Sequence, residues 1–314
     1  MAVDLKEISE VPERTHPLWR KRLELEGRYS DTRKTELDFN RPHMYTLAKT
    51  ARLGLRLLGL WDRGRKNAVQ PVLIESDLTV PHLPPALEGL RILHLSDFHF
   101  SKFDTEQVPT IVNLLKGLTV DLCCVTGDYK YGHMGNMDHI RPAMERVLQS
   151  FSSTHGAFGI LGNHDFSFMI PELEAVGLRM LVNEGTRINL RDTPVWIGGT
   201  DDPHNYCCDD VNAAMQGSKE DTFKILMVHS PERIAEAAQA GAQLYLCGHT
   251  HGGQICLPGW GMLKSNADCD RQFAEGTWHY ENMAGNTTRG LGVTDVPVRY
   301  CCPPEANLLT LRHS

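Results

Sequence analysis

From residue 90 onward, short apolar runs recur along the chain, and most end in a polar residue beside glycine, aspartate or histidine. Apolar runs of about four to eight residues bounded by such turn signals are typical of buried β-strands. The pattern predicts strands at 90–96, 121–126, 157–161, 180–190, 195–199, 223–228, 243–247, 278–282, 289–294 and 306–311, preceded by an extended segment within 68–85. Helical spacing of apolar residues predicts helices at 105–118, before residue 148, at 171–176 and at 232–240. This alternation favours an α/β fold.

The first 66 residues differ from the rest of the chain. Residues 1–43 are charged and poor in apolar periodicity, and they predict a polar extension with one short helix at 16–26. Residues 44–66 predict a basic amphipathic helix. The remaining residues, 67–314, are assigned to one main domain that carries the chemistry.

The segment 44–63 has two interpretations. As a helix, its basic face holds Lys49, Arg52, Arg56 and Arg63, and the opposite face holds Met44, Leu47, Ala51, Leu55 and Leu58. Such a helix, with Trp61 near its end, suits the surface of a membrane that contains anionic lipids. The same apolar face would equally well pack on the main domain and leave the arginines in solvent.

Composition narrows the class of protein. Of the 314 residues, 41% are hydrophobic and 23% charged, which is ordinary for a globular domain. The net charge of -7 argues against nucleic acid as an electrostatic partner. The polar beginning does not resemble a secretory signal, and no apolar run is long enough to span a membrane as a helix. Nine cysteines without a Cys-x-x-Cys motif indicate reduced thiols in the cytoplasm.

Side chains that bind metals follow the ends of five predicted strands. They are Asp97 with His99, Asp128, Asn163 with His164, His229, and His249 with His251. Because the carboxyl ends of neighbouring strands in an α/β sheet lie side by side, these five loops can converge. The mixture of carboxylate, amide and imidazole suits Mn²⁺, Fe or Zn²⁺ and is too large for one four-coordinate ion. The sequence therefore predicts two divalent ions that share a carboxylate.

This ligand set predicts a phosphohydrolase. Two ions ~3.5–4 Å apart can clamp a phosphate and provide a bridging hydroxide for in-line attack on phosphorus. The leaving oxygen then needs a proton donor. His164 stands beside the predicted ligand Asn163 and suits that role, with Asp165 as a carboxylate that orients its ring.

Four further residues carry predictions. Arg289, His204 and Asn205 lie on loops near the expected site and are candidates to bind substrate. Arg289 suits a phosphate, but it would as easily form a structural ion pair. His94 lies inside the predicted strand 90–96, so we expect a hydrogen-bonded core residue rather than a ligand.

Together, the five blocks resemble the calcineurin-like metallophosphoesterase superfamily, whose motifs run Asp-x-His, Gly-Asp, Gly-Asn-His-Asp/Glu, His and Gly-His-x-His. All five occur in this order between Asp97 and His251. The resemblance implies an α/β fold of two packed mixed sheets flanked by helices, in four layers. It assigns one ion to Asp97, His99, Asp128 and His251, and the other to Asp128, Asn163, His229 and His249. Asp128 is then the bridge, and His164 matches the catalytic histidine.

A narrower similarity concerns bacterial membrane-associated members. It rests on GHTHGGQICLPGWG and on the stretch from Arg289 to Glu305. Some members hydrolyse UDP-2,3-diacylglucosamine in lipid A synthesis, and others are phosphodiesterases. The resemblance implies hydrolysis of a phosphodiester or pyrophosphate in a lipid-linked or nucleotide-sugar substrate at the cytoplasmic membrane face, with Mn²⁺ ahead of Fe and Zn. The alternative is a soluble phosphodiesterase of small nucleotides or glycerophosphodiesters. A non-enzymatic scaffold would have lost ligands, and none is missing.

Overall fold

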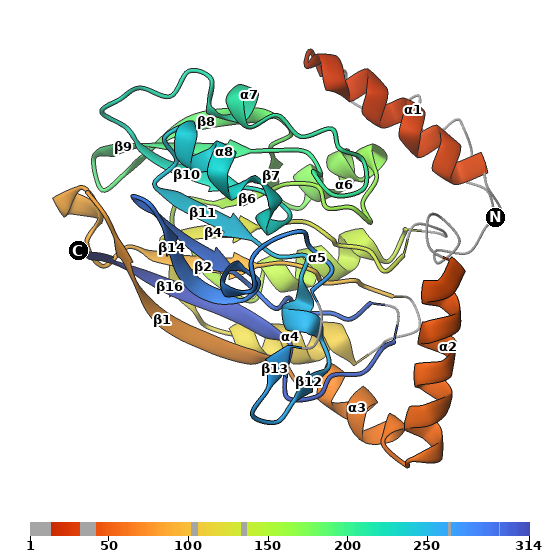
Figure 1. Ribbon diagram of the computed structural model, residues 1–314. Coiled ribbons are helices and arrows are strands. Elements are labelled where there is room, and N and C mark those ends of the chain that lie inside the picture. The colour runs from red at the N-terminus through yellow and green to blue at the C-terminus, as the bar shows by residue number, and fades with distance from the viewer. Residues whose placement is uncertain (1–13, 32–41, 102–105, 133–136, 263–264, 295) are drawn as a thin grey trace.

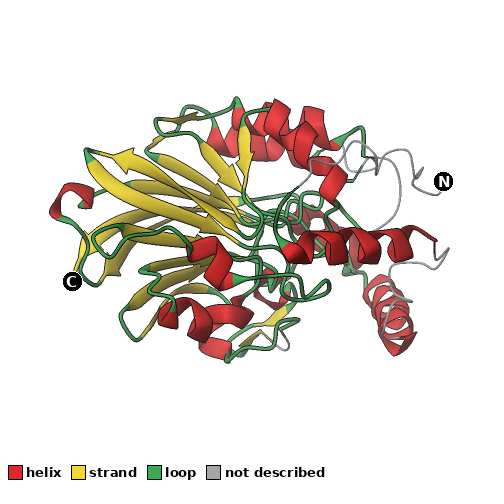
Figure 2. Ribbon diagram, turned by 90° about the horizontal axis from the view of Figure 1, so that it is seen from above, coloured by secondary structure: helices red, strands yellow, loops and turns green. Residues whose placement is uncertain are grey.

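The computed structural model describes residues 14–31, 42–101, 106–132, 137–262, 265–294 and 296–314. Two six-stranded sheets pack face to face, and helices cover both outer faces (Figure 1). From above, the strands lie between two groups of helices (Figure 2). The predicted fold class, two mixed sheets flanked by helices, is confirmed.

The first sheet has the strand order β1-β16-β2-β4-β6-β7. Its strands are β1 (Val72–Val80), β2 (Arg91–Leu95), β4 (Leu122–Val125), β6 (Ala157–Gly159), β7 (Leu178–Met180) and β16 (Glu305–His313). All neighbours are parallel except β16 and β2. The carboxyl ends of β2, β4 and β6 therefore meet at one edge of this sheet.

The second sheet has the order β14-β15-β11-β10-β9-β8. Its strands are β8 (Glu184–Leu190), β9 (Thr193–Gly199), β10 (Phe223–Met227), β11 (Leu244–Cys247), β14 (Gly276–Tyr280) and β15 (Met283–Thr287). The four inner strands are parallel, and the outer two pair antiparallel with their neighbours. Two short pairs complete the strands: β3 (Thr119–Val120) with β5 (Ser152–Ser153), and β12 (Cys256–Leu257) with β13 (Gly261–Met262).

Alternation along the strands separates three apolar layers. In β2, Ile92 faces the layer between the sheets and Leu93 the outer layer. In β10, Ile225 faces the inner layer and Leu226 the opposite outer layer. The first sheet is covered by α4 (Gln107–Leu115), α5 (Ile140–Leu148) and α6 (Ile170–Ala175), and the second by α7 (Val211–Met215) and α8 (Ile234–Gln239). Short 3-10 turns are η3 (Pro85–Leu87), η4 (Ser167–Met169), η5 (Pro231–Arg233), η6 (His251–Gly253) and η7 (Arg271–Phe273).

The described residues of the N-terminal segment form three helices, which are α1 (Pro17–Asp31), α2 (Pro42–Leu57) and α3 (Trp61–Ala68). Helix α1 is longer than the predicted helix at 16–26. Both α1 and α2 stand on the side of the molecule where the strand-end loops gather (Figure 1). Residues 1–13 and 32–41 of the predicted polar extension lie outside the described residues.

The single helix predicted for 44–66 is instead two helices, α2 and α3. Gly59 has a φ of +67°, and the Leu60 N–H donates to the Leu55 carbonyl at 2.8 Å. This hydrogen bond and the left-handed glycine form the motif that commonly ends helices, because glycine adopts positive φ at little cost. The chain therefore changes direction after Leu57.

Two predicted strands differ in the structure. The run 180–190 is divided between β7 and β8, because Asn183 adopts a φ of +53° and its side-chain oxygen accepts the backbone N–H groups of Asp201 and Asp210. The run 289–294 is a loop, and the strand that precedes it, β15, ends at Thr287. Gly285 within β15 faces the Trp278 ring so closely that a Cβ atom would collide with it.

Candidate metal centre

All seven predicted ligands lie in loops directly after β2, β4, β6, β10 and β11, and all seven are buried. They are Asp97, His99, Asp128, Asn163, His229, His249 and His251. The parallel strands place these loops at one edge of the two packed sheets. The convergence expected from the sequence is therefore present in the structure.

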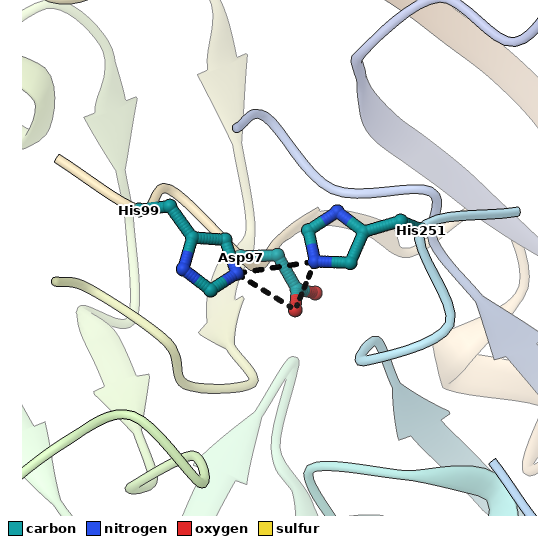
Figure 3. A group of neighbouring side chains, drawn as sticks. All are labelled: Asp97, His99 and His251. Carbon is teal, nitrogen blue, oxygen red and sulfur yellow. Dashed lines mark hydrogen bonds and ion pairs between the residues drawn. The ribbon is translucent and has the colours of Figure 1, made fainter. Parts of the chain in front are cut away.

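The first group of side chains is Asp97, His99 and His251 (Figure 3). The Nε2 atoms of His99 and His251 are 3.1 Å apart. Oδ1 of Asp97 lies 3.5 Å from Nε2 of His251 and 3.8 Å from Nε2 of His99. Three ligand atoms from the loops after β2 and β11 thus face a common point.

The second group is built around Asn163, His229 and His249. Oδ1 of Asn163 lies 2.9 Å from Nε2 of His229 and 3.0 Å from Nδ1 of His249. Asp128 lies between the two groups, because its Oδ2 is 3.4 Å from Nε2 of His99 and 3.3 Å from Nε2 of His229. One carboxylate oxygen therefore contacts a member of each group.

The chemistry of these donors fits divalent cations. Imidazole, carboxylate and amide groups from five loops face one another in a buried volume, where unpaired charge is costly. Burial lowers the pKa of His249 and His251 well below the usual range, so both rings are neutral and each keeps an unprotonated nitrogen. Burial also raises the pKa of Asp97, which a bound cation would oppose. The described residues can therefore hold metal ions at this edge.

The backbone of the centre is strained. Positive φ angles occur at Asp97 (50°), His99 (45°), Asp128 (56°), His249 (69°) and His251 (52°). Residues other than glycine rarely adopt this region, and each such residue costs on the order of 1–3 kcal/mol unless its surroundings impose it. Five of the seven predicted ligands therefore share this uncommon backbone conformation.

Two glycines allow the loops to approach each other. A Cβ atom on Gly248 would collide with the carboxylate of Asp97, and one on Gly162 would collide with that of Asp128. The glycine that precedes each histidine motif therefore leaves room for a carboxylate from a neighbouring loop.

Hydrogen bonds behind the centre orient its rings. Nδ1 of His229 contacts the Thr126 carbonyl at 2.7 Å, and Nδ1 of His99 contacts the Lys130 carbonyl at 3.2 Å. Such bonds on the far nitrogen hold the ring and present Nε2 to the centre. The Asp128 carboxylate raises the pKa of His229 well above its usual range, against the opposing effect of burial.

His164 and Asp165 follow Asn163 directly but occupy different surroundings. The His164 ring is half-buried and meets the His99 ring edge-on, with centroids 4.9 Å apart. The buried Asp165 carboxylate accepts the backbone N–H groups of Asp128 at 2.7 Å, Gly162 at 2.8 Å and Tyr129 at 2.9 Å. Asp165 thus ties the second and third loops together, and its predicted effect on the His164 ring stays a prediction.

The three predicted substrate contacts differ in their surroundings. The half-buried His204 ring lies 4.2 Å from the His249 ring, and its Nδ1 is 2.8 Å from Glu232 Oε1. Asn205 is exposed in the same loop. Arg289 forms an ion pair with Glu305 through its Nε at 2.5 Å, as in the structural alternative considered from the sequence.

Sequence reasoning missed two buried arginines beside the centre. Arg22 of α1 donates to the Asp165 carbonyl at 2.5 Å, and Arg299 donates to the His251 carbonyl at 3.2 Å. Neither has a sequence signal of burial, because isolated arginines are normally exposed.

The prediction for His94 is confirmed. Its ring is buried between Asn286 Oδ1 at 2.7 Å and Thr126 Oγ1 at 3.0 Å.

Comparison with known proteins gives a consistent assignment. The calcineurin-like phosphoesterase model matches residues 90–253, more than half of the chain. The uncharacterized metallophosphoesterase YkuE of Bacillus subtilis is 28% identical over 261 residues, covering 79% of this chain and 89% of its own. Phosphodiesterase YaeI of Escherichia coli is 28% identical over 229 residues, covering 70% and 82%. A Danio rerio transmembrane protein with metallophosphoesterase domain is 29% identical over 274 residues, covering 80% and 60%. The chain therefore belongs to the calcineurin-like phosphoesterase family of metal-dependent hydrolases.

Proposed function

We propose that the protein hydrolyses a phosphodiester or pyrophosphate bond with two divalent cations, one held by each group of ligands. The observation that carries this proposal is the position of Asp128, whose Oδ2 contacts His99 of one group and His229 of the other. A shared carboxylate is what a two-metal site requires. Mn²⁺ is the first choice, and Fe or Zn²⁺ fits the same mixture of nitrogen and oxygen donors.

Side chains of the protein would supply proton transfer and substrate binding. Bound cations would neutralise the phosphate and supply an activated water. We assign to His164 the transfer of a proton to the leaving oxygen, and its half-buried position beside His99 supports this role. His204 borders the same centre through His249, and its contact with Glu232 fixes the ring, so we assign it to substrate binding. Asn205 and Arg289 are weaker candidates for that role.

A lipid-linked substrate is supported by the exposed end of α2. Three leucines there are largely in solvent, with Leu53 59%, Leu57 79% and Leu58 72% exposed. Trp260, in the turn between β12 and β13, is 78% exposed. The opposite side of α2 packs on the domain through Ala48, Ala51 and Leu55. Ala51 and Leu55 of the predicted apolar face therefore pack on the domain, and the proposed membrane contact rests on the exposed leucines instead.

We infer that these leucines rest on an anionic membrane surface, with exposed Arg56 and Arg63 beside the lipid headgroups. None of the described helices has the length and apolarity needed to cross a membrane. The proposed location is the cytoplasmic face of the cell membrane. UDP-2,3-diacylglucosamine, a nucleotide-linked lipid with a pyrophosphate, is the substrate to test first. A soluble phosphodiesterase is the second candidate, favoured by the name of the Escherichia coli relative.

The first experiment measures release of UMP from UDP-2,3-diacylglucosamine by the purified full chain with Mn²⁺. Bis-p-nitrophenyl phosphate is assayed in parallel, and Asp97→Ala and Asp128→Ala serve as controls. Metal-dependent release of UMP that both controls lack would support the lipid substrate. Cleavage of the aryl diester alone would favour the soluble phosphodiesterase. Near-normal turnover by Asp128→Ala would refute the two-metal mechanism.

The membrane proposal has its own test. Full-length protein is sedimented with vesicles of phosphatidylcholine alone or with one third phosphatidylglycerol. We expect binding only to the anionic vesicles and a loss of binding in the Leu57→Ser/Leu58→Ser variant. Equal recovery of wild type and variant, or no binding to either vesicle, would contradict it.

A further inference from the structure

Helix α1 lies outside the segment matched by the family model, and it contributes a fully buried arginine to the vicinity of the metal centre. Arg22 uses three guanidinium nitrogens in three directions. One donates to the Asp165 carbonyl at 2.5 Å, a second to Asp201 Oδ1 at 2.6 Å and the third to Glu26 Oε1 at 2.7 Å. Its Cζ also lies 3.4 Å from the centre of the Tyr206 ring.

The partners of Arg22 belong to two loops that border the centre. The first loop follows β6 and carries Asn163, His164 and Asp165. Glu26 holds the same loop at a second point, because it accepts the Ser167 backbone N–H at 2.8 Å and the Ser167 hydroxyl at 2.6 Å. The pair of Arg22 and Glu26 therefore clamps this loop on either side of Phe166.

The second loop follows β9 and carries His204. Asp201 Oδ1 accepts both Arg22 and the Asp202 backbone N–H, the latter at 2.8 Å. The Asp202 carboxylate in turn accepts the backbone N–H groups of His204, Asn205 and Tyr206 at 3.1, 2.7 and 2.8 Å. The Arg22 guanidinium thus joins the loop of His164, the proposed proton donor, to the loop of His204, the proposed substrate contact.

We propose that Arg22 is a positioning residue of the metal centre, which holds the loop of Asn163 and His164 against the loop of His204; this rests on the proposed function of that centre. The link to the ligands is short. The residue whose carbonyl Arg22 holds, Asp165, also fixes the backbone of Asp128 at 2.7 Å. Movement of Asp165 would therefore displace both Asn163 and Asp128.

The buried charges of Arg22, Glu26 and Asp201 depend on one another. Arg22, Glu26 and Asp201 are buried together, and a buried charge is tolerated only when it is paired and hydrogen-bonded. A guanidinium has donors in a fixed planar fork, so it can serve three acceptors at once. Lysine carries the same charge but cannot reproduce that geometry. Arg22→Lys is therefore the variant that retains charge and tests position.

The experiment uses the full chain with Arg22→Lys and Arg22→Met. Arg20, exposed on the same helix, provides the matched controls Arg20→Lys and Arg20→Met. Mn²⁺ affinity is measured by calorimetry on chelator-treated protein, and kcat and KM are measured with bis-p-nitrophenyl phosphate. Thermal unfolding is followed by circular dichroism, so that every assay is run on folded protein.

Loss of an outer partner of a metal site typically lowers affinity or activity by about 10–100-fold. For Arg22→Lys we expect kcat to fall by about tenfold with KM within about twofold, and Mn²⁺ affinity to fall by several-fold, while the Arg20 variants match wild type. Folded Arg22→Lys with wild-type kcat and Mn²⁺ affinity would overturn the proposal, even if its melting temperature is lower, because such a residue only anchors α1.

One further variant and the Mn²⁺ affinity cover the other outcomes. If Arg22→Met does not fold, Ser167→Ala removes the hydroxyl that donates to Glu26. Wild-type kcat and wild-type Mn²⁺ affinity in both Ser167→Ala and Arg22→Lys would overturn the proposal. If wild type cleaves no phosphodiester, the proposed function fails, but Mn²⁺ affinity still reports on position. A several-fold weaker affinity in Arg22→Lys, absent in Arg20→Lys, would then support Arg22 as a positioning residue.

Discussion

Replacing Asp165 with asparagine tests whether its carboxylate holds the two central loops together. The side chain is buried, and its oxygens accept three backbone N–H groups. Oδ2 serves Asp128 and Gly162, and Oδ1 serves Tyr129. An asparagine keeps the shape but replaces one oxygen with an NH₂ group, which donates and cannot accept. At least one backbone N–H then faces another donor in the interior.

The expected cost follows from these contacts. A buried donor left unsatisfied costs about 1–3 kcal/mol, and the two remaining hydrogen bonds lose the extra strength of an ionised acceptor. The substitution also removes a buried carboxylate, since burial and then the neighbouring Asp128 carboxylate raise the pKa of Asp165. With that offset, we expect Asp165→Asn to lower the free energy of unfolding by about 2 kcal/mol. Asp165→Ala, which loses all three bonds, should cost more.

The assay is urea denaturation at pH 8, followed by circular dichroism, with activity on bis-p-nitrophenyl phosphate measured alongside. Asp192→Asn is the matched control, because Asp192 is exposed in the turn between β8 and β9. That variant should stay within about 0.5 kcal/mol of wild type. If Asp165→Asn also stays within this margin and retains its activity, the three hydrogen bonds do not hold the loops and the reasoning is wrong.

Three more predictions follow from particular contacts. Burial lowers the pKa of His94 to about 4, so the folded state resists protonation and stability falls as pH drops below about 6.5. His94→Leu should reduce the decrease in the free energy of unfolding between pH 7.5 and pH 5, measured by urea denaturation, by about 2 kcal/mol. A decrease equal to that of wild type would contradict this. A Cβ on Gly64 would lie 2.7 Å from atoms of Val298 and Tyr300, so Gly64→Ala should lower the free energy of unfolding in urea by about 1–3 kcal/mol. Gly54 has open space around it, so Gly54→Ala should not lower that free energy. Mn²⁺ at a hundred times its Kd should stabilise chelator-treated protein by about 2.7 kcal/mol per site in thermal unfolding, and Asp128→Ala should lose this gain.

Local signals were sufficient for the central strands and for the polar residues that follow them. Each of β2, β4, β6, β10 and β11 is a short, mainly apolar run with a glycine, histidine or aspartate at its end or within four residues after it, and each agrees with its predicted strand within a few residues. Parallel pairing then obliges neighbouring strand ends to share an edge. That rule brings Asp97 to Asp128 and Asn163 within the first sheet, and His229 to His249 within the second. The convergence of Asp97 and His251 also requires that the two sheets pack face to face, which the rule does not provide.

Element boundaries depended on contacts that no local pattern contains. The run 180–190 has the apolar content of one strand, but the side chain of Asn183 accepts backbone N–H groups from a distant loop and turns the chain between two sheets. The amphipathic pattern of 44–63 predicted one helix, whereas the left-handed Gly59 ends it and exposes Leu58. In both cases a single backbone conformation outweighed a correct hydrophobic pattern.

The sequence by itself determined the central strands and the order of the ligand-bearing loops, because strand patterns and turn residues are local. The two packed sheets and the family were expected from the resemblance of the five blocks to known metallophosphoesterases. The tertiary structure decided which charged residues are buried. Arg22 and Glu26 are four residues apart in a helix, which in sequence is indistinguishable from an exposed ion pair. Their burial depends on Asp201, 179 residues from Arg22 in the chain. A buried charge needs partners in three dimensions, and only the folded chain brings those partners together.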